Sequence, residues 1–266
     1  MNLEEHFSLS RPPFPRAVTD AALLSTPAMT QALERLRFAL ERDTIALLVA
    51  ESGCGKSTVL SRFAKSLDAA SYHVLSTSLT TLSPFSFIAH LVATTGLPGR
   101  RFKGETAATL LMHMRSQPKR TVVLIDEGHL LPDASLEDLR LLTADNLDRH
   151  SPFALVLVGQ PLLRERLAEP QHYALWQRIG VRLQLRPLSE AEVGSFIEHH
   201  IKAAGYRRKQ SLFDADTIAA IFQHSRGIPR LIQNLALDAM LAAMAAGKHT
   251  VDVEAVQHAI VDAEGL

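Results

Sequence analysis

A glycine-rich segment that ends in Lys-Ser is the strongest chemical signal in this sequence. Residues 50–57 read Ala-Glu-Ser-Gly-Cys-Gly-Lys-Ser, and we name them the phosphate loop. An apolar run, residues 44–49, precedes the phosphate loop, and residues 58–67 follow it with apolar side chains at helical spacing. A strand, a glycine-rich turn, Lys-Ser and a helix form the local context in which backbone N–H groups and a helix N-terminus bind phosphate. The pattern therefore predicts a nucleotide-phosphate site.

The residues of the phosphate loop indicate which nucleotide chemistry it supports. Gly53 and Gly55 permit the backbone curl that points N–H groups at phosphate oxygens. Lys56 can reach β- and γ-phosphates, and Ser57 can hold Mg²⁺. The expected cofactors are ATP and Mg²⁺, with nucleotide contacts from Ser52, Gly53, Cys54, Gly55, Lys56, Ser57 and Thr58. The strict pattern begins with Gly where this chain has Ala50, and the alternative is a glycine turn before a core helix.

Two adjacent carboxylates follow another apolar run, residues 121–125. A run of that kind suits a strand of a parallel sheet covered on both faces, and ligands bind at the carboxyl ends of such strands. We expect Asp126 to hold Mg²⁺ and Glu127 to polarise the attacking water as the catalytic base. Adjacent acids at a strand end are costly unless a cation neutralises them, although a solvated turn is the simpler interpretation of these two residues alone.

Three further polar residues are candidates to complete a phosphoryl-transfer site. Gln160 follows the fourth apolar run and is expected to orient the attacking water, with a turn before proline as the alternative. Arg178 lies between the last two strands and is expected to supply a cation to the transition state in a neighbouring subunit. Arg182 and Arg166 are the reserve candidates for that role. Arg230 begins a helix after Gly-Ile-Pro and is expected to face the phosphates, with a solvated surface arginine as the alternative.

Composition places the chain among ordinary globular proteins and excludes several classes. Of 266 residues, 47% are hydrophobic and 21% are charged, which is enough to bury a core. Lys plus Arg and Asp plus Glu number 28 each, so any nucleic-acid contact must come from a local patch. Cys54 is the one cysteine, which leaves no intramolecular disulfide and fits a reducing cytosol. The polar N-terminus and the lack of an apolar run near ~18 residues predict a cytoplasmic protein with no membrane partner.

Hydrophobic periodicity predicts five strands and the helices around them. The strands are expected at residues 44–49, 72–77, 121–125, 153–158 and 181–185. The helices are expected at residues 27–41, 84–95, 105–116, 135–147, 189–204, 212–225, 229–246 and 252–264. Strands that alternate with helices favour a parallel α/β sheet, and the strand-free region after Pro187 favours a separate helical domain.

This pattern divides the chain into three regions. Residues 1–43 are expected to form an N-terminal segment and helix that pack on the nucleotide pocket, with residues 1–26 irregular. Residues 44–186 form the predicted α/β nucleotide-binding core, a parallel five-stranded sheet. Residues 187–266 form the predicted all-helical lid domain, which opens with the capping box Ser189-Glu190-Ala191-Glu192.

The order of these motifs resembles that of the AAA+ ATPases, P-loop NTPases that carry a helical lid. The phosphate loop corresponds to Walker A, Asp126-Glu127 to Walker B, Gln160 to sensor 1, Arg178 to the arginine finger and Arg230 to sensor 2. The resemblance covers nearly the whole chain. It implies a Mg²⁺-dependent ATP hydrolase that binds nucleotide between the subunits of an oligomer.

A closer likeness is to the ExeA and TniB-like bacterial ATPases, which include a secretion ATPase and the target-selecting ATPases of transposons. It rests on His6-Phe7-Ser8-Leu9, Pro12-Pro13-Phe14, Asp126-Glu127-Gly128-His129-Leu130, residues 158–167 and residues 227–233. ExeA-type proteins look like this module with an added membrane span and wall-binding tail, and the end of this chain at Leu266 favours the transposon branch. That branch implies rings or helical filaments on double-stranded DNA, recruitment of a transposase and regulation of transposition.

DNA binding is implied by the family likeness, and Arg100-Arg101-Phe102-Lys103 is its best local candidate. This loop, bounded by Gly and Pro, is expected to contact phosphates through Arg100, Arg101 and Lys103 without reading bases. A solvated basic loop is the alternative, as it is for Arg207-Arg208-Lys209. The competing functions are a secretion or envelope-assembly module that acts on protein, a nucleotide-binding switch without turnover, and a small-molecule kinase.

Overall fold

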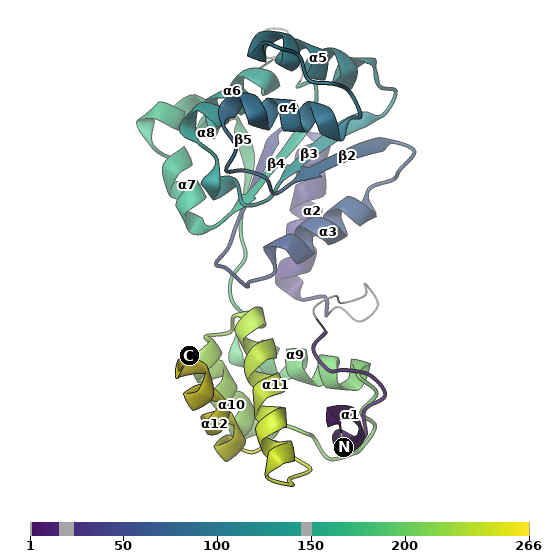
Figure 1. Ribbon diagram of the computed structural model, residues 1–266, viewed down its shortest axis with the longest axis vertical. Coiled ribbons are helices and arrows are strands. Elements are labelled where there is room, and N and C mark those ends of the chain that lie inside the picture. The colour runs from purple at the N-terminus through teal and green to yellow at the C-terminus, as the bar shows by residue number, and fades with distance from the viewer. Residues whose placement is uncertain (1, 16–23, 145–150, 266) are drawn as a thin grey trace. The chain divides into compact units, whose positions relative to one another are not determined.

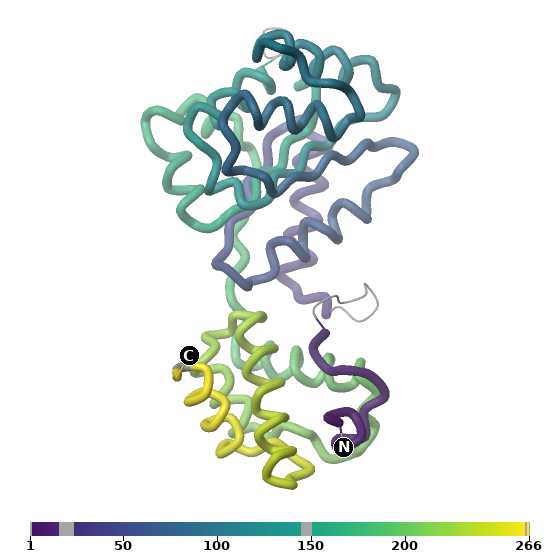
Figure 2. The backbone as a smooth tube through the Cα atoms, viewed as in Figure 1, coloured from purple at the N-terminus to yellow at the C-terminus, as the bar shows by residue number. Residues whose placement is uncertain are grey.

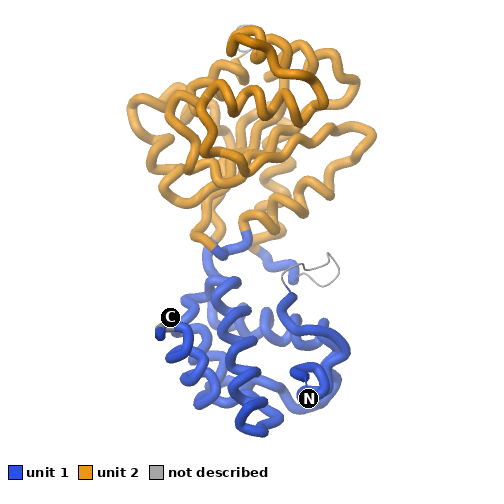
Figure 3. The backbone as a smooth tube through the Cα atoms, in the orientation of Figure 1, with its two compact units in different colours: residues 1–27, 53–55, 186–266 blue, residues 28–52, 56–185 orange. Residues whose placement is uncertain are grey.

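The computed structural model of the protein describes residues 2–15, 24–144 and 151–265 (Figure 1). The chain divides into two compact units (Figure 3). The helical unit comprises Met1–Pro27, Gly53–Gly55 and Arg186–Leu266, and the sheet unit comprises Ala28–Ser52 and Lys56–Leu185. Each unit has its own hydrophobic core.

The sheet unit is built on five parallel strands in the order β2-β3-β4-β1-β5. The strands are β1 Ile45–Val49, β2 Tyr72–Thr77, β3 Arg120–Ile125, β4 Ala154–Gly159 and β5 Ile179–Gln184. Every residue of β1 and β4 is buried, as expected for inner strands of a parallel sheet covered on both faces. The edge strand β5 instead alternates buried and exposed residues. The predicted parallel five-stranded α/β fold is confirmed.

Helices cover both faces of this sheet (Figure 1). They are α2 Pro27–Glu41, α3 Lys56–Ser66, α4 Pro84–Thr94, α5 Lys103–Ser116, α6 Asp133–Thr143, α7 Pro161–Leu167 and α8 Tyr173–Arg178, with short 3₁₀ turns η2 Gly128–Leu130 and η4 Pro170–His172. The apolar faces of α4 to α8 share one core with β1, β3 and β4. The connection from β1 to β2 crosses the sheet in the opposite direction from the later ones, so right-handed crossovers put α3 on the other face.

The predicted elements match the observed ones closely, with small differences at their ends. The fifth strand begins at Ile179, two residues earlier than predicted. The helix predicted at 105–116 begins at Lys103, and the one predicted at 135–147 begins at Asp133. The predicted end of the latter helix, residues 145–147, lies outside the described residues. Neither early helix start has a side-chain cap, so the sequence carries no capping signal at either point.

The C-terminal part of the helical unit contains four helices. These are α9 Glu190–Ala203, α10 Ala215–Ser225, α11 Pro229–Ala245 and α12 Val253–Glu264. The predicted capping box opens α9, because the Ser189 side chain accepts from the Glu192 N–H and the Glu192 carboxylate accepts from the Ser189 N–H. Arg186 also donates to that carboxylate, and this hydrogen bond, with those from Ser189, lowers the pKa of Glu192 to about 2.

The segments that precede α9 and α11 are joined by a hydrogen bond at Gly227, a position that requires glycine. The Leu188 N–H donates to the Gly227 carbonyl at 2.8 Å. Gly227 has φ of +75°, and a Cβ there would lie 1.9 Å from the Leu188 carbonyl oxygen. Because only glycine fits this contact, the Gly-Ile-Pro-Arg sequence fixes where α11 begins, and with it the place of Arg230 on that helix.

The N-terminal segment differs from the expectation. Residues 1–26 were expected to be irregular, whereas Leu3–Phe7 form the helix α1, opened by an Asn2–Glu5 capping box. The side chains of Phe7, Leu9 and Phe14 enter the core of the helical unit, beside which this part of the backbone runs (Figure 2). The expected single segment 1–43 on the nucleotide pocket is therefore divided between the two units, because α2 packs with the sheet unit from Ala28 onward.

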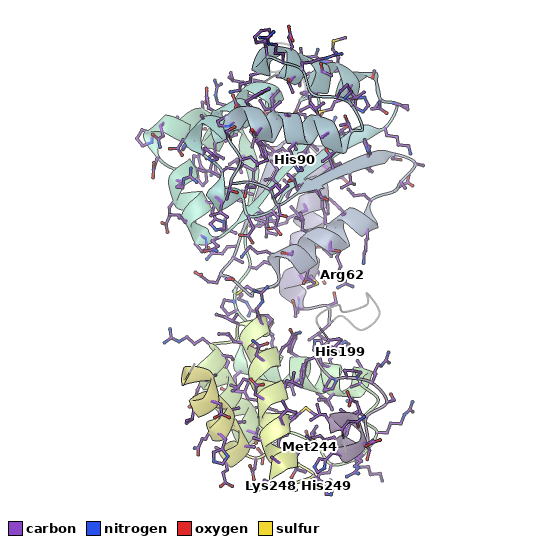
Figure 4. The ribbon with its side chains drawn as sticks, viewed as in Figure 1. Arg62, His90, His199, Met244, Lys248 and His249 are labelled. Atoms are coloured by element: carbon purple, nitrogen blue, oxygen red, sulfur yellow. The ribbon has the colours of Figure 1, made fainter. Side chains whose placement is uncertain are left out.

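A histidine contact also holds the N-terminal segment to the helical unit. His6 Nε2 lies 2.8 Å from the Lys248 carbonyl oxygen, and the His6 ring stacks on His249 with centroids 4.6 Å apart. Figure 4 labels Lys248 and His249 in the turn after α11. The Ser10 N–H donates to the Ala204 carbonyl at 2.8 Å. These contacts join residues almost at opposite ends of the chain, which no local sequence pattern can predict.

The buried His200 is expected to make the helical unit acid-sensitive. It is 3% exposed in α9, packs against the rings of Phe196 and Phe14, and burial lowers its pKa from 6.5 to about 4. Between those two pH values the unfolded chain binds a proton that the folded unit does not. The unfolding free energy should therefore be complete above pH 6.5 and fall as the pH drops from 6.5 to about 4.

His200→Phe should remove this dependence, which we expect to be on the order of 2 kcal/mol. Native-state hydrogen exchange of the α9 amides at pH 7 and about pH 4.5 measures it within the helical unit alone. The exposed His258 in α12 supplies a matched control, His258→Phe, which should behave as the wild type. An equal loss of protection in acid for His200→Phe and the wild type would contradict the assignment.

Candidate nucleotide-binding site

The phosphate loop connects β1 to α3 with two residues in the left-handed region. Gly53 has φ of +84° and Gly55 has φ of +89°. A Cβ on Gly55 would meet no atom within 4 Å, so backbone conformation and not space requires glycine there. Lys56 is the first residue of α3, and its Nζ donates to the Ala50 and Glu51 carbonyls at 2.9 and 3.1 Å. The Lys56 ammonium group thus lies against the backbone of the phosphate loop, where it was predicted to act.

Ser57 and Asp126, the two predicted magnesium ligands, are in contact. Ser57 Oγ donates to Asp126 Oδ2 at 2.8 Å, although the two residues are 69 positions apart in the sequence. The other carboxylate oxygen of Asp126 accepts from the Glu127 N–H at 2.9 Å. Mg²⁺ is usually bound by one or two carboxylates together with substrate phosphates and water, so this pair of oxygens fits Mg²⁺ held with a nucleotide.

Glu127 has an unusual backbone conformation directly after β3. Its φ of 52° and ψ of 31° lie in the left-handed region, which is strained for a residue with a side chain. The Thr80 hydroxyl, which is fully buried, donates to the Glu127 carbonyl at 3.0 Å and holds this conformation. Strain of this kind persists only where surrounding contacts impose it, and it gathers at functional sites. Thr80 was missed by the sequence analysis, because it lies 47 residues from Glu127 in a stretch of Ser and Thr without a motif.

The end of β4 lies beside the ends of β1 and β3, the two strands that lead into the phosphate loop and Asp126-Glu127. β4 lies between β1 and β3, and the Gly159 carbonyl accepts from the Ala50 N–H at the start of the phosphate loop. Gln160 is the N-cap residue of α7 and is half-buried. Its backbone N–H donates to His129 Nδ1 at 3.4 Å, and the same nitrogen lies 3.5 Å from the Glu127 carboxylate. No role was predicted for His129 from the sequence, although it stands two residues after the predicted base.

The three arginines considered for the finger role have different surroundings. Arg178 is the last residue of α8 and half-buried, and its carbonyl accepts from the Thr44 hydroxyl at 3.1 Å. Arg182 lies over the ring of Trp176 at 3.7 Å and donates to the carbonyl of the same residue. Arg166 donates to two backbone carbonyls and pairs with Asp133. Both reserve candidates thus have their guanidinium groups engaged within their own subunit.

Arg230 is the second residue of α11 in the helical unit, and its side chain is exposed. It follows Pro229, which stands at the first position of the helix, where proline is well tolerated. Its predicted contact with nucleotide phosphates stays a prediction.

The proposed DNA-contact loop is shorter than expected. Arg100 and Arg101 are exposed in the connection between α4 and α5, and Phe102 is 59% exposed with the Arg101 guanidinium 5.6 Å from its ring. Lys103, however, is the first residue of α5 and pairs with Asp138 at 2.7 Å. Lys103 was expected in the loop, so its place in α5 corrects that boundary, and its contact with DNA phosphates stays a prediction.

The second basic cluster, Arg207-Arg208-Lys209, lies in the helical unit and was expected to be solvated. All three residues are exposed. Arg208 also donates to Ser8 Oγ at 2.8 Å, so it connects the region after α9 to the N-terminal segment.

The sheet order and the phosphate loop define the fold, which is a P-loop NTPase fold of the AAA+ type. Residues 39–167 match the family described as an AAA domain. That range includes the phosphate loop, Asp126, Glu127 and Gln160.

Among individual proteins, the chain is similar in sequence to general secretion pathway protein A of Aeromonas hydrophila. The identity is 32% over 256 residues, which cover 93% of this chain and 46% of that protein. The chain thus spans about half the length of this relative. The likeness supports the secretion side of the ExeA and TniB-like resemblance, whereas membership of the transposition group stays a prediction.

Solved structures with the same fold come from several AAA+ proteins. Cdc6p of Pyrobaculum aerophilum has a TM-score of 0.69 at 16% identity, over 97% of this chain and 70% of that chain. The ORC1 protein of Aeropyrum pernix, solved in complex with DNA, has a TM-score of 0.68 at 17% identity, over 93% and 68%. The RuvB branch migration motor of Thermotoga maritima has a TM-score of 0.58 at 22% identity, over 89% and 71%. At these identities the similarity concerns the fold alone. In the described parts of the chain, no helix is both long and apolar enough to cross a membrane.

Proposed function

We propose that this protein hydrolyses ATP with Mg²⁺ at the carboxyl edge of its sheet. The observation that carries this proposal is the contact between Ser57 and Asp126 beside the strained Glu127. These three side chains come from the phosphate loop and the end of β3, which the fold brings to one edge. Bound MgATP supplies the phosphoanhydride bond that is broken and the cation that neutralises its phosphates.

Each residue of the site has a distinct role in this proposal. The N–H groups of residues 52–58 and the Lys56 ammonium bind the phosphates, and Ser57 and Asp126 hold Mg²⁺. Glu127 accepts a proton from the attacking water, which Gln160 helps to orient. The strained backbone of Glu127 supports its role as base. The hydrogen bond from Thr80 keeps the residue in a conformation that it would otherwise leave, and such strain is typical of functional sites.

The site is expected to be completed by a second copy of the chain. In the proposed oligomer, a ring or a helical filament, Arg178 of one subunit serves the nucleotide bound by the next, and Arg230 contacts the same phosphates within its own subunit. Loss of γ-phosphate contacts after hydrolysis would bias subunit packing and act as a timer for disassembly.

Two classes of target are open to such an ATPase. The similarity to general secretion pathway protein A over 93% of the chain favours a protein component of a secretion or envelope-assembly system. The exposed Arg100, Arg101 and Phe102 favour double-stranded DNA, contacted through its phosphates, and with it the regulation of transposition through target selection and a transposase partner. ATP is available in the cytoplasm, so we expect the module to work there in either case.

Lys56→Ala should lower ATP affinity by at least about 10-fold, because the phosphates lose their one positively charged partner in the phosphate loop. Titration calorimetry with a slowly hydrolysed ATP analogue measures this affinity. The matched control is Lys65→Ala, an exposed lysine in the last turn of the same helix, which should bind as the wild type. Equal affinity of Lys56→Ala and the wild type would contradict nucleotide binding at the phosphate loop.

Electron microscopy of the protein with that analogue, with and without duplex DNA, separates the two targets. Assemblies that need both analogue and DNA would favour DNA as the target. The double variant Arg100→Ala/Arg101→Ala should then fail to assemble. Assemblies indifferent to DNA would favour a protein target. Binding that weakens steeply with salt is a further mark of phosphate contacts.

A further inference from the structure

His129 contacts both the proposed catalytic base and the end of β4. Its side chain is only 7% exposed. Its Nδ1 lies 3.5 Å from Glu127 Oε2 and 3.4 Å from the backbone nitrogen of Gln160. One nitrogen atom thus stands between the group proposed to activate water and the strand end proposed to orient it.

Two glycines allow this close approach, and neither has positive φ. A Cβ on Gly159 would lie 3.1 Å from the His129 backbone nitrogen and 2.9 Å from a methyl carbon of Leu163. A Cβ on Gly128 would lie 3.2 Å from the Val158 carbonyl oxygen. The backbone of η2 therefore packs directly on the end of β4, and a larger residue at either position would move His129 away from it.

Arg166 fixes the same segment from its other end. Its guanidinium donates to the His129 carbonyl at 2.7 Å and to the Leu131 carbonyl at 2.8 Å, and it also pairs with Asp133. Hydrogen bonds from Arg166 and from the buried His172 lower the pKa of Asp133, so this carboxylate stays charged. With its backbone held in this way, His129 can respond to its neighbours mainly through its ring.

The ring nitrogen Nδ1 can serve only one of its two neighbours at a time. Without a proton it accepts the Gln160 N–H, and it then offers nothing to the Glu127 carboxylate. With a proton it donates to Glu127, and the Gln160 N–H then loses its acceptor. A carboxylate that accepts this hydrogen bond is a weaker base than one that is free to take a proton from water.

We propose that His129 is a positioning residue that couples the end of β4 to Glu127 through this shared nitrogen. Nδ1 carries no proton in this arrangement and accepts the Gln160 N–H, so Gln160 is held in register and Glu127 is free to act as base. This inference rests on the proposed ATP hydrolysis. It assigns the residue that links Gln160 to Glu127.

Replacing His129 tests the coupling by kinetics. His129→Leu keeps a buried apolar side chain but loses both hydrogen bonds, and we expect kcat to fall about 10–100-fold with KM for ATP unchanged, since misplaced groups cost that much. His129→Asn offers a donor and an acceptor near the position of Nδ1 and should recover most of the rate. A wild-type kcat in His129→Leu, or an equal loss in His129→Asn, would overturn the proposal. The exposed His258→Leu is the matched control.

Nitrogen-15 NMR of histidine-labelled wild-type protein tests the coupling without turnover or substitution. We expect Nδ1 of His129 to be unprotonated both in the nucleotide-free protein and after addition of Mg²⁺ and a slowly hydrolysed ATP analogue. A proton on Nδ1 in either sample would overturn the proposal. A wild-type protein that binds no analogue would instead contradict the proposed function itself, so the two failures are distinguishable.

Discussion

Glu127→Gln is expected to leave ATP bound and to slow its hydrolysis by a factor on the order of 10²–10⁴. Gln has nearly the shape of Glu but cannot take a proton from the attacking water. The contacts that place residue 127 are made by its backbone, to the Thr80 hydroxyl and the Asp126 carboxylate, so they survive the substitution. Single-turnover hydrolysis gives the rate, and titration with a slowly hydrolysed ATP analogue gives the affinity.

The same substitution should trap the assembled state, because assembly is proposed to end when the γ-phosphate is lost. Particle size in the presence of ATP should therefore persist in Glu127→Gln and decay in the wild type. Glu105→Gln, an exposed residue in the first turn of α5, is the control and should match the wild type. A wild-type rate in Glu127→Gln would remove Glu127 from the base role.

The parts of the site that the sequence predicted are those encoded by short stretches of chain. The phosphate loop needs residues with positive φ at fixed places, and Gly53 and Gly55 provide them. The run before Asp126 is wholly apolar because β3 is buried on both faces, and the carboxylate must then stand at the strand end. Alternation of such strands with helices was enough to predict the parallel sheet.

The parts that were missed depend on contacts between distant residues. Thr80 holds Glu127 from 47 positions away, and His129 meets Gln160 from 31 positions away, both through backbone groups that every residue has. No residue type or spacing in the sequence predicts such a contact. The helix start at Lys103 was missed for a local reason, since its N-cap residue Phe102 makes no capping hydrogen bond.

The N-terminal segment shows the same limit in a different way. Its prolines argue against a long helix before Pro27, but they say nothing about which core receives Phe7 and Phe14. Each unit has its own apolar core, and the sequence has no pattern that ranks the two. The Asn2–Glu5 capping box is a signal that could have been found, since Asn and Glu three residues apart before an apolar residue are typical of a helix start.

Arg178→Ala is expected to lower kcat of the assembled protein by a factor on the order of 10³–10⁵, the usual contribution of an arginine finger. The ATP affinity of an isolated subunit should not change, because the finger is proposed to act on a neighbour's nucleotide. Arg182→Ala is the matched control: that guanidinium lies over Trp176 in its own subunit, so its loss should leave kcat near the wild-type value. A normal kcat in assembled Arg178→Ala would move the role to another arginine.

Mixing two inactive variants tests whether Arg178 acts between subunits. An interface that joins an Arg178→Ala subunit, which keeps Glu127, to a Glu127→Gln subunit, which keeps Arg178, has every group of the proposed site. In a head-to-tail assembly formed from equal amounts, random placement makes about a quarter of the interfaces whole, so about a quarter of the wild-type rate should return. A finger that acted within its own subunit would give no recovery, because every nucleotide would then lack either its base or its arginine.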